Sequence, residues 1–142
     1  MNKKIHVKAL LYTERNDRQI LVSEDFDKVK KDYYYRPLGG TVEFGERAVE
    51  TLAREILEET GEEATIGDLL YISENIFVYN GNPGHEIVYI YKGNFKTDKL
   101  LHQDEFYITE SNGQQVKCKW VDKNLFKNGT LRLVPKGLTE QL

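Results

Sequence analysis

The amino-acid sequence predicts an α/β protein in which helices cover a mixed β-sheet. Segments rich in β-branched and aromatic residues lie on both sides of one central segment with helical periodicity, and a short terminal helix follows. The 142 residues match the size of an ordinary single domain, and no Pro- or Ser-rich linker divides them. We therefore expect residues 1–142 to form one domain.

The first third of the chain is expected to supply strands that lead to the central helix. Residues 5–12 alternate polar and apolar side chains before becoming apolar, which indicates a strand. After a polar turn, residues 19–23 are expected to return as the second strand of a hairpin, and the charged residues 24–32 to form a loop. Residues 33–37 are expected to be a short strand, because Pro37 restricts Arg36 to an extended conformation.

The central segment is expected to begin with a glycine-rich loop at residues 39–46 and to continue as a helix over residues 47–60. Gly61, just after the last turn, is suited to the left-handed conformation that ends many helices. Apolar residues recur at the spacing i, i+3, i+4, i+7, which predicts one buried stripe: Val49, Leu52, Ala53 and Ile56.

The remaining elements follow from strand and turn signals. Residues 64–79 are expected to be a strand bent near Gly67, and residues 80–84 are a dense turn signal, so that residues 71–95 form a long hairpin. Residues 98–113 are expected to be irregular. A strand follows at 115–121 with Trp120 in the core, Asp122 caps a short turn through Phe126, and Pro135 opens a terminal helix.

Four glutamates gather on the central helix, on the side away from the predicted apolar stripe. Each like-charged pair at i, i+3 or i, i+4 costs roughly 0.2–0.5 kcal/mol. One interpretation is a solvated acidic face. The other is a site for a hard divalent cation such as Mg²⁺, which takes oxygen ligands and would relieve the repulsion. The adjacent glycine-rich loop favours the second interpretation. The four are Glu55, Glu58, Glu59 and Glu62.

The spacing within this segment resembles a known family motif. The run Gly40-x5-Glu46-x7-Arg54-Glu55-Ile56-x-Glu58-Glu59-x-Gly61 resembles the box of the MutT-like Nudix hydrolases, G-x5-E-x7-R-E-U-x-E-E-x-G-U, where U is a bulky apolar residue. Only the last position departs, because Glu62 stands there. The resemblance covers Gly40 to Glu62 and implies the Nudix fold, an α/β/α sandwich with a mixed β-sheet.

The same resemblance implies a chemistry and assigns residues to it. It predicts a Mg²⁺-dependent hydrolase, with Mn²⁺ as an alternative metal, that cleaves a diphosphate linkage. The implied metal ligands are the glutamates 55, 58 and 59 and the carbonyl of Gly39. Arg54 belongs to the catalytic set and is expected to orient a glutamate. Three residues are candidates for the general base: Glu55 in the box and the downstream acids Glu105 and Glu110.

The substrate implied by the resemblance is a nucleoside diphosphate linked to another group. Arg36 is a candidate phosphate ligand because a guanidinium suits phosphate oxygens, although a plain surface role is the alternative. Tyr79 lies 17 residues after Glu62, as in Nudix proteins that cleave dinucleoside polyphosphates, but a strand aromatic usually fills a core. Phe77 and residues 33–35 are further candidates for base stacking. A non-catalytic ligand-sensing module is the alternative function.

Composition excludes several other classes. The net charge of −3 gives no footprint for nucleic-acid binding. Cys118 is the single cysteine, so no internal disulfide forms, which suits the cytoplasm, and it is expected to be a small strand residue. No stretch approaches the roughly 20 apolar residues of a membrane span. The sequence contains no phosphate-binding P-loop, serine nucleophile elbow or zinc motif. Whether the protein is a homodimer stays open.

Overall fold

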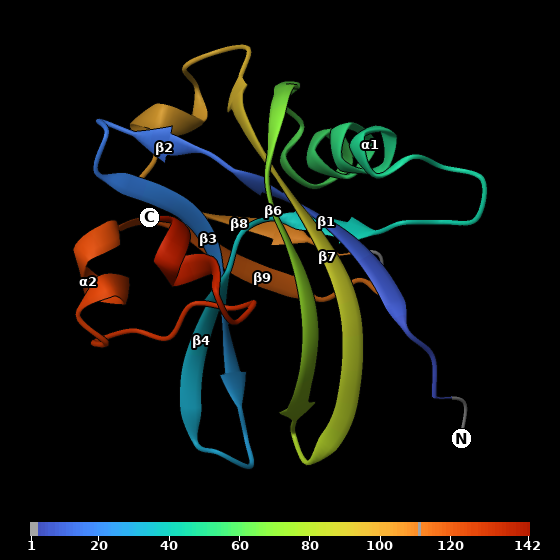
Figure 1. The fold of residues 1–142 in the computed structure, drawn as a ribbon. Helices are drawn as coiled ribbons and strands as arrows, with labels where there is room; N and C mark the ends of the chain where they lie inside the picture. Colours follow the sequence, from blue (N-terminus) through green and yellow to red (C-terminus); the bar gives the residue numbers. More distant parts are fainter. Residues whose placement is uncertain (1–2, 111) are drawn as a thin grey trace.

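The computed structural model describes residues 3–110 and 112–142, which form two β-sheets flanked by helices (Figure 1). One sheet has the strand order β5-β1-β7-β6. β1 pairs parallel with β7, and the other pairs are antiparallel, so this sheet is mixed as predicted. Its strands are β1 (His6–Tyr12), β5 (Gly39–Thr41), β6 (Ala64–Tyr79) and β7 (Asn82–Phe95).

The second sheet is antiparallel and has the strand order β2-β3-β9-β8, with β4 paired to the far part of β3. The β3–β4 hairpin therefore extends beyond the body of the sheet, beside the β6–β7 hairpin (Figure 1). The strands are β2 (Glu14–Arg15), β3 (Gln19–Asp27), β4 (Asp32–Arg36), β8 (Glu105–Thr109) and β9 (Gln115–Asp122).

Helices lie on both sides of the sheets, which confirms the α/β/α sandwich. α1 (Ala48–Thr60) buries Leu52 and Ile56 in a core with Leu11 and Trp120. α2 (Lys123–Lys127) and the 3₁₀ helix η2 (Leu138–Gln141) contribute to a second core. This core also holds Leu10 and Tyr12 of β1, whose side chains point to the face opposite Leu11. A further 3₁₀ helix, η1 (Leu100–His102), precedes β8. None of the helices among the described residues is long and apolar enough to cross a bilayer.

Several predicted elements are confirmed within a residue or two. α1 spans the predicted helix, and Gly61 ends it with a φ of 73°. β6 and β7 form the long hairpin, with register irregularities between Ile66 and Tyr71 where the bend was expected. Trp120 is buried and donates from Nε1 to the carbonyl of Leu100 at 3.1 Å. Asp122 caps α2 by accepting from the backbone N–H of Asn124 at 2.9 Å.

Five boundary predictions were wrong, most of them because strand pairing continues through polar and glycine-rich sequence. Residues 24–27 belong to β3, and residues 39–41 form β5 rather than a loop. The hairpin turn contains only residues 80 and 81, since 82–84 already pair in β7. Residues 98–113 contain η1 and β8. Pro135 follows a cis peptide bond, and the terminal helix begins three residues later at Leu138.

Candidate active site

Helix α1 buries a different face from the one that the apolar stripe predicted. Val49 and Ala53 are exposed, whereas Thr51, Leu52 and Ile56 are buried. At about 100° per residue, this rotates the buried face toward residues 55 and 59. The Glu55 side chain is accordingly only 19% exposed, and Glu58 on the outer side is 59% exposed. Two of the four glutamates therefore lie at the buried face, and the prediction that all four face away from it was wrong.

Strand β5 lies against one of these inward glutamates. A Cβ atom added to Gly40 would stand 2.6 Å from the Cδ atom of Glu55, and one added to Gly39 would stand 1.9 Å from the carbonyl oxygen of Ala9. Both contacts are far below van der Waals separation, so only glycine permits this packing. The two glycines thus bring the β5 backbone into contact with the Glu55 carboxylate.

The pairing of β5 also sets the direction of the Gly39 carbonyl. Leu11 N donates to Leu38 O at 2.8 Å, and Val42 N donates to Val7 O at 2.7 Å. Because bonded and non-bonded pairs alternate in an antiparallel ladder, Gly39, opposite Leu10, is a non-bonded position. Its carbonyl therefore points away from β1, as a backbone ligand for a cation requires.

Arg54 organises the acids along α1. Its guanidinium donates two hydrogen bonds to Glu46, of 3.0 and 2.9 Å, and contacts Glu55 at 3.2 Å and Glu58 at 3.4 Å. Thr51 also donates to Glu46, at 2.8 Å. The hydrogen bonds from Arg54 and then Thr51 lower the pKa of Glu46 from 4.5 to about 2. Arg54 thus holds two of the glutamates by charge-assisted contacts, as an orienting residue would.

Glu59 is the most perturbed acid of the site. Its Oε1 atom is buried and has no hydrogen-bond partner within residues 3–110 and 112–142. The pKa of Glu59 is raised to about 8, first by burial and then by the negative charges of Glu55 and Glu110, while Arg36 opposes the shift. A buried carboxylate oxygen without a partner costs free energy, and strongly perturbed pKa values cluster at functional sites.

This arrangement fits a hard divalent cation, although the carboxylates are not fully assembled around one point. Among the described residues, no three His, Cys, Asp or Glu side chains already form a group that could hold a metal ion. Arg54 keeps Glu58 on the outer side of the helix. The unpaired Glu59 oxygen, the neighbouring Glu55 carboxylate and the free direction of the Gly39 carbonyl nevertheless form an oxygen donor set of the kind Mg²⁺ takes.

Of the two downstream acids, only Glu110 lies near Glu59. The charge of Glu110 raises the pKa of Glu59 and acts on Lys8 as well. Glu105 instead forms an ion pair of 3.5 Å with Lys117 across β8 and β9. Between the two, the charge interactions of Glu110 with Glu59 and Lys8 favour it as a candidate base, and Glu55 in the box stays the other candidate.

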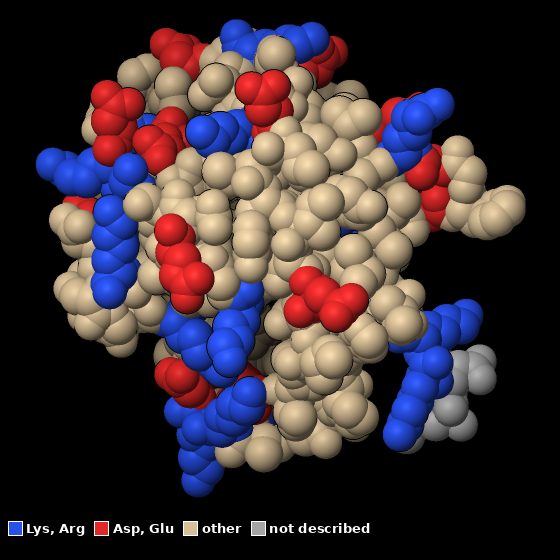
Figure 2. Space-filling model, in the orientation of Figure 1, with Lys and Arg blue, Asp and Glu red and all other residues tan. Residues whose placement is uncertain are grey.

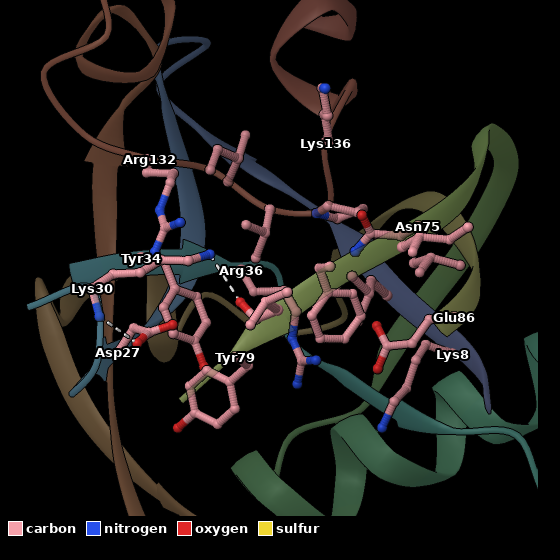
Figure 3. A pocket seen from close by; sticks show the side chains of 18 residues that line it. Lys8, Asp27, Lys30, Tyr34, Arg36, Asn75, Tyr79, Glu86, Arg132 and Lys136 are labelled. Atoms are coloured by element: carbon pink, nitrogen blue, oxygen red, sulfur yellow. Dashed lines mark hydrogen bonds between the residues drawn. The ribbon is translucent and has the colours of Figure 1, made fainter. Parts of the chain in front are cut away.

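A pocket of about 590 Å³ lies between the two sheets. β1, β6 and β7 form one wall, and β4 with residues 132–136 forms the other. Figure 2 shows Lys and Arg side chains gathered around a hollow in this region. Arg36 and Tyr79, the two residues predicted to bind substrate, both line the pocket (Figure 3).

Lys8 and Arg36 connect this pocket with the glutamates. Burial and the positive charge of Arg36 lower the pKa of Lys8, and the charges of Glu86, Glu110 and Glu55 act in the opposite direction. Lys8 Nζ donates to Thr41 Oγ1 at 2.6 Å, which holds it beside β5. The pocket therefore has a cationic end next to the acids of α1, where a bound anion would meet both.

The aromatic side chains of the pocket are fixed by their own contacts. The rings of Tyr34 and Tyr79 pack edge to face at 5.6 Å, and both hydroxyls donate to Asp25, at 2.8 and 3.4 Å. Phe77 packs against the Cα atom of Gly84, where a Cβ would stand 2.4 Å from the ring. These contacts leave the Tyr79 ring in the pocket wall but engage its hydroxyl within the protein.

Sequence reasoning missed several pocket residues. Lys8 has the signature of an outward strand residue, and Lys30 lies in the segment predicted as a loop. Arg132 follows the last predicted strand and matches no motif. The alternation of Asp32, Tyr34 and Arg36 in β4 was the available signal, since period two places these side chains on one face.

Glu62, the one departure from the box, has a local explanation. Its Oε1 atom accepts a hydrogen bond of 2.6 Å from Thr97 Oγ1, just beyond β7. Thr60 Oγ1 accepts from the Glu62 backbone N–H at 3.1 Å. Polar contacts thus hold the helix exit where the motif has an apolar residue.

Comparisons with known proteins agree with this architecture. The family model described as "NUDIX domain" matches residues 3–142. No curated protein matches the chain. A NUDIX hydrolase from Nitrosomonas europaea superposes with a TM-score of 0.63 at 18% identity, covering 97% of this chain and 85% of the other. A MutT protein from Methanosarcina mazei Go1 superposes with a TM-score of 0.65 at 16% identity, covering 99% and 92%. At these identities the structures share the fold.

Proposed function

Because the chain belongs to the NUDIX family of hydrolases, we propose that it is a Mg²⁺-dependent pyrophosphohydrolase that cleaves a diphosphate linkage within a nucleotide. The substrate class is a nucleoside diphosphate linked to another group, with dinucleoside polyphosphates included. One observation carries the proposal: the buried Oε1 atom of Glu59, which has no hydrogen-bond partner among the described residues, belongs to a carboxylate on which the charges of Glu55, Glu110 and Arg36 all act.

Glu55, Glu59 and the carbonyl of Gly39 would hold the metal ion, and Glu58, which Arg54 holds on the outer side of the helix, would turn inward to join them. When bound, a divalent cation neutralises phosphate charge and lowers the pKa of a bound water. Arg54 contacts Glu55 and Glu58, which orients both carboxylates. Glu55 or Glu110 accepts the proton of the attacking water. Mn²⁺ is expected to replace Mg²⁺, since it takes the same oxygen ligands.

Lys8 and Arg36 bind the phosphate oxygens from the pocket side. A guanidinium offers a fork of donors that matches two phosphate oxygens, and an ammonium contributes a point charge. The organic part of the nucleotide then occupies the pocket against Tyr34, Phe77 and Tyr79, where aromatic side chains stack a base. This places the cleaved linkage between the cationic end of the pocket and α1.

The test is hydrolysis of a nucleotide panel with millimolar Mg²⁺ and, in parallel, with EDTA. The panel contains dinucleoside polyphosphates, ADP-ribose, nucleotide sugars and oxidised nucleoside triphosphates. Metal-dependent release of a nucleoside phosphate from at least one compound supports the proposal. Binding of these compounds without product release in either condition contradicts it and favours a ligand-sensing module.

A further inference from the structure

The pocket has cationic side chains in addition to Lys8 and Arg36, which lie at its end beside α1. Five cationic side chains line it, against the two carboxylates of Asp27 and Glu86. The charge of Glu86 acts on Lys8, at the end near α1. Lys30 and Arg132, the distal cation pair, lie apart from Lys8 and Arg36 in the close view of the pocket (Figure 3). The five cations are Lys8, Lys30, Arg36, Arg132 and Lys136.

Among the described residues, Asp27 accepts no hydrogen bond from a side chain of the distal cation pair. Its Oδ1 atom accepts from the backbone N–H groups of Val29 and Lys30, at 3.0 and 2.9 Å, and its Oδ2 atom accepts from Asn80 N at 3.2 Å. These bonds close the β3–β4 turn and tie it to the β6–β7 hairpin. The lone pairs of Asp27 are therefore directed at main-chain donors. Asp27 acts on Lys30 through charge alone, and Arg132 forms an ion pair with Asp32 at 3.6 Å, so within the described part of the chain neither cation is held by a side-chain hydrogen bond to a carboxylate.

Arg132 has a buried donor that no described residue satisfies. Its Nε atom is buried and lacks an acceptor among the described residues. Asp32 Oδ2, at 3.6 Å, is beyond hydrogen-bond distance. The guanidinium lies 5.6 Å from the centroid of the Tyr34 ring, whose hydroxyl is held by Asp25. The Arg132 side chain as a whole is 36% exposed and lines the pocket, so the guanidinium beyond the buried Nε is the part that an anionic ligand oxygen can reach.

Lys30 supplies the second part of this position. Its Nζ atom donates one hydrogen bond of 2.9 Å to the carbonyl of Val78, which fixes the ammonium at the pocket wall. An ammonium has three N–H donors, so two are left for a ligand. Figure 3 shows Lys30 and Arg132 on the same side of the pocket, next to the Tyr34 ring.

The two cationic ends are offset along β4. Asp32, which Arg132 contacts, and Arg36 are four residues apart in this strand, which corresponds to about 13 Å at 3.3 Å per residue. The Tyr34 ring lies between them on the same face. A nucleoside stacked there would have one phosphate group at Arg36 and a second at the distal cation pair.

Resting on the proposed function, we infer that the distal cation pair binds a phosphate monoester of the substrate that is separate from the diphosphate being cleaved. The substrate class is then a diphosphate-linked nucleotide whose sugar carries an additional phosphate. Charge-assisted hydrogen bonds from Lys30 and Arg132 provide the selectivity for that group.

Matched substrate pairs that differ by one phosphate monoester test this inference. Suitable pairs are NADP⁺ with NAD⁺, and coenzyme A with its dephospho form. We expect kcat/KM to favour the phosphorylated member of at least one pair by about tenfold or more. This ratio should fall toward one in Lys30→Met and in Arg132→Met, and persist in Lys127→Met, a charge removal on the exposed side of α2. Because both members are measured on the same folded enzyme, a loss of stability does not change the ratio.

Equal kcat/KM within both pairs, or a preference that survives both pocket substitutions, overturns the inference while leaving the proposed function intact. A second measurement does not require turnover. In a titration of the metal-free protein with inorganic phosphate, followed by amide chemical shifts, we expect saturable shifts near residues 30 and 132 that Lys30→Met abolishes. Shifts confined to the surroundings of Lys8 and Arg36 would contradict it, whether or not any nucleotide is cleaved.

Discussion

At the scale of single residues, the site depends on an acid whose environment opposes its charge. Glu59 has a buried oxygen without a partner among the described residues, and Glu55 packs against Gly40, where an added Cβ would displace its side chain. Arg54 and Glu46 satisfy each other close by through two hydrogen bonds. We therefore expect Glu59 and Glu55 to serve turnover and Glu46 to serve stability, and substitutions should distinguish these two roles.

Gly40→Ala should lower turnover more than it lowers stability. The added Cβ would stand 2.6 Å from Glu55 Cδ, and the flexible side chain is the part that can move away. We expect the melting temperature to change by only a few degrees, as for a substitution of about 1 kcal/mol, while kcat falls about tenfold or more. Steady-state kinetics and a thermal melt on the same preparation check this. Unchanged kcat would show that the position of Glu55 does not matter for turnover.

Glu46→Gln should destabilise the protein in a pH-dependent way. The pKa of Glu46 is about 2 in the folded protein and close to 4.5 when the chain is unfolded. The ionised carboxylate therefore stabilises the fold fully above about pH 4.5, and this contribution is lost as the pH falls toward 2. The difference in free energy of unfolding between wild type and variant should be largest at pH 7 and shrink below pH 4.5. Denaturant titrations at pH 7, 4 and 3 measure it, and a constant difference would contradict it.

At the scale of elements, sequence patterns located α1 and the long hairpin but not the orientation of the helix. Val49 and Ala53 continue the apolar period, yet they are exposed, because Gly40 lets β5 pack against Glu55 instead. That contact joins residues distant in sequence, so periodicity alone could not reveal it. Motif spacing predicted roles for the box glutamates, Gly39, Arg54 and Tyr79, and Arg36 was predicted from its place just before the glycine-rich loop. Lys30 and Arg132 were not, since only the tertiary fold brings them to one pocket.

Strand ends were predicted less well than strand centres for a related reason. Glu24–Asp27 and Gly39–Thr41 have low strand propensity, and both are strand because a neighbouring strand pairs with them. Register and pairing depend on the partner strand, which a local sequence pattern does not include.

Binding of a divalent metal ion to the glutamates of α1 should raise the melting temperature of the protein. Relief of the repulsion among the glutamates adds to binding, and a ligand at ten times its Kd contributes about 1.4 kcal/mol, or roughly 3–6 °C in melting temperature. We expect this increase with Mg²⁺ for wild type and for Glu63→Gln, whose carboxylate pairs with Lys96 instead. Glu59→Gln should lose it. A shift that NaCl of equal ionic strength reproduces would indicate screening and no metal site.

At the scale of the whole molecule, the fold places a cationic pocket between two sheets and an acidic helix at its end. β1 and β4 belong to different sheets, yet Lys8 and Arg36 meet beside α1. Binding of phosphate therefore depends on how the sheets are assembled, whereas the carboxylates depend on one helix. Substitutions on the two sides should affect different kinetic constants.

Arg36→Gln should mainly weaken substrate binding. Loss of one charge-assisted hydrogen bond to phosphate corresponds to about 10- to 100-fold in kcat/KM, and we expect most of it in KM. Arg18→Gln, an exposed arginine near Asp122, serves as the control for charge. A large fall in kcat at unchanged KM would instead assign Arg36 to the chemical step.

The most direct test of the central claim compares the turnover of Glu59→Gln with that of Glu63→Gln on the best nucleotide of the panel at saturating Mg²⁺. Both substitutions remove one carboxylate near the end of α1, but Glu59 lies near Glu55 and Glu110, whereas Glu63 forms an ion pair with Lys96. We predict that Glu59→Gln lowers kcat beyond the roughly 10- to 100-fold that losing an outer-shell partner of a metal costs, while Glu63→Gln stays near wild type. Wild-type turnover in folded Glu59→Gln would contradict the account.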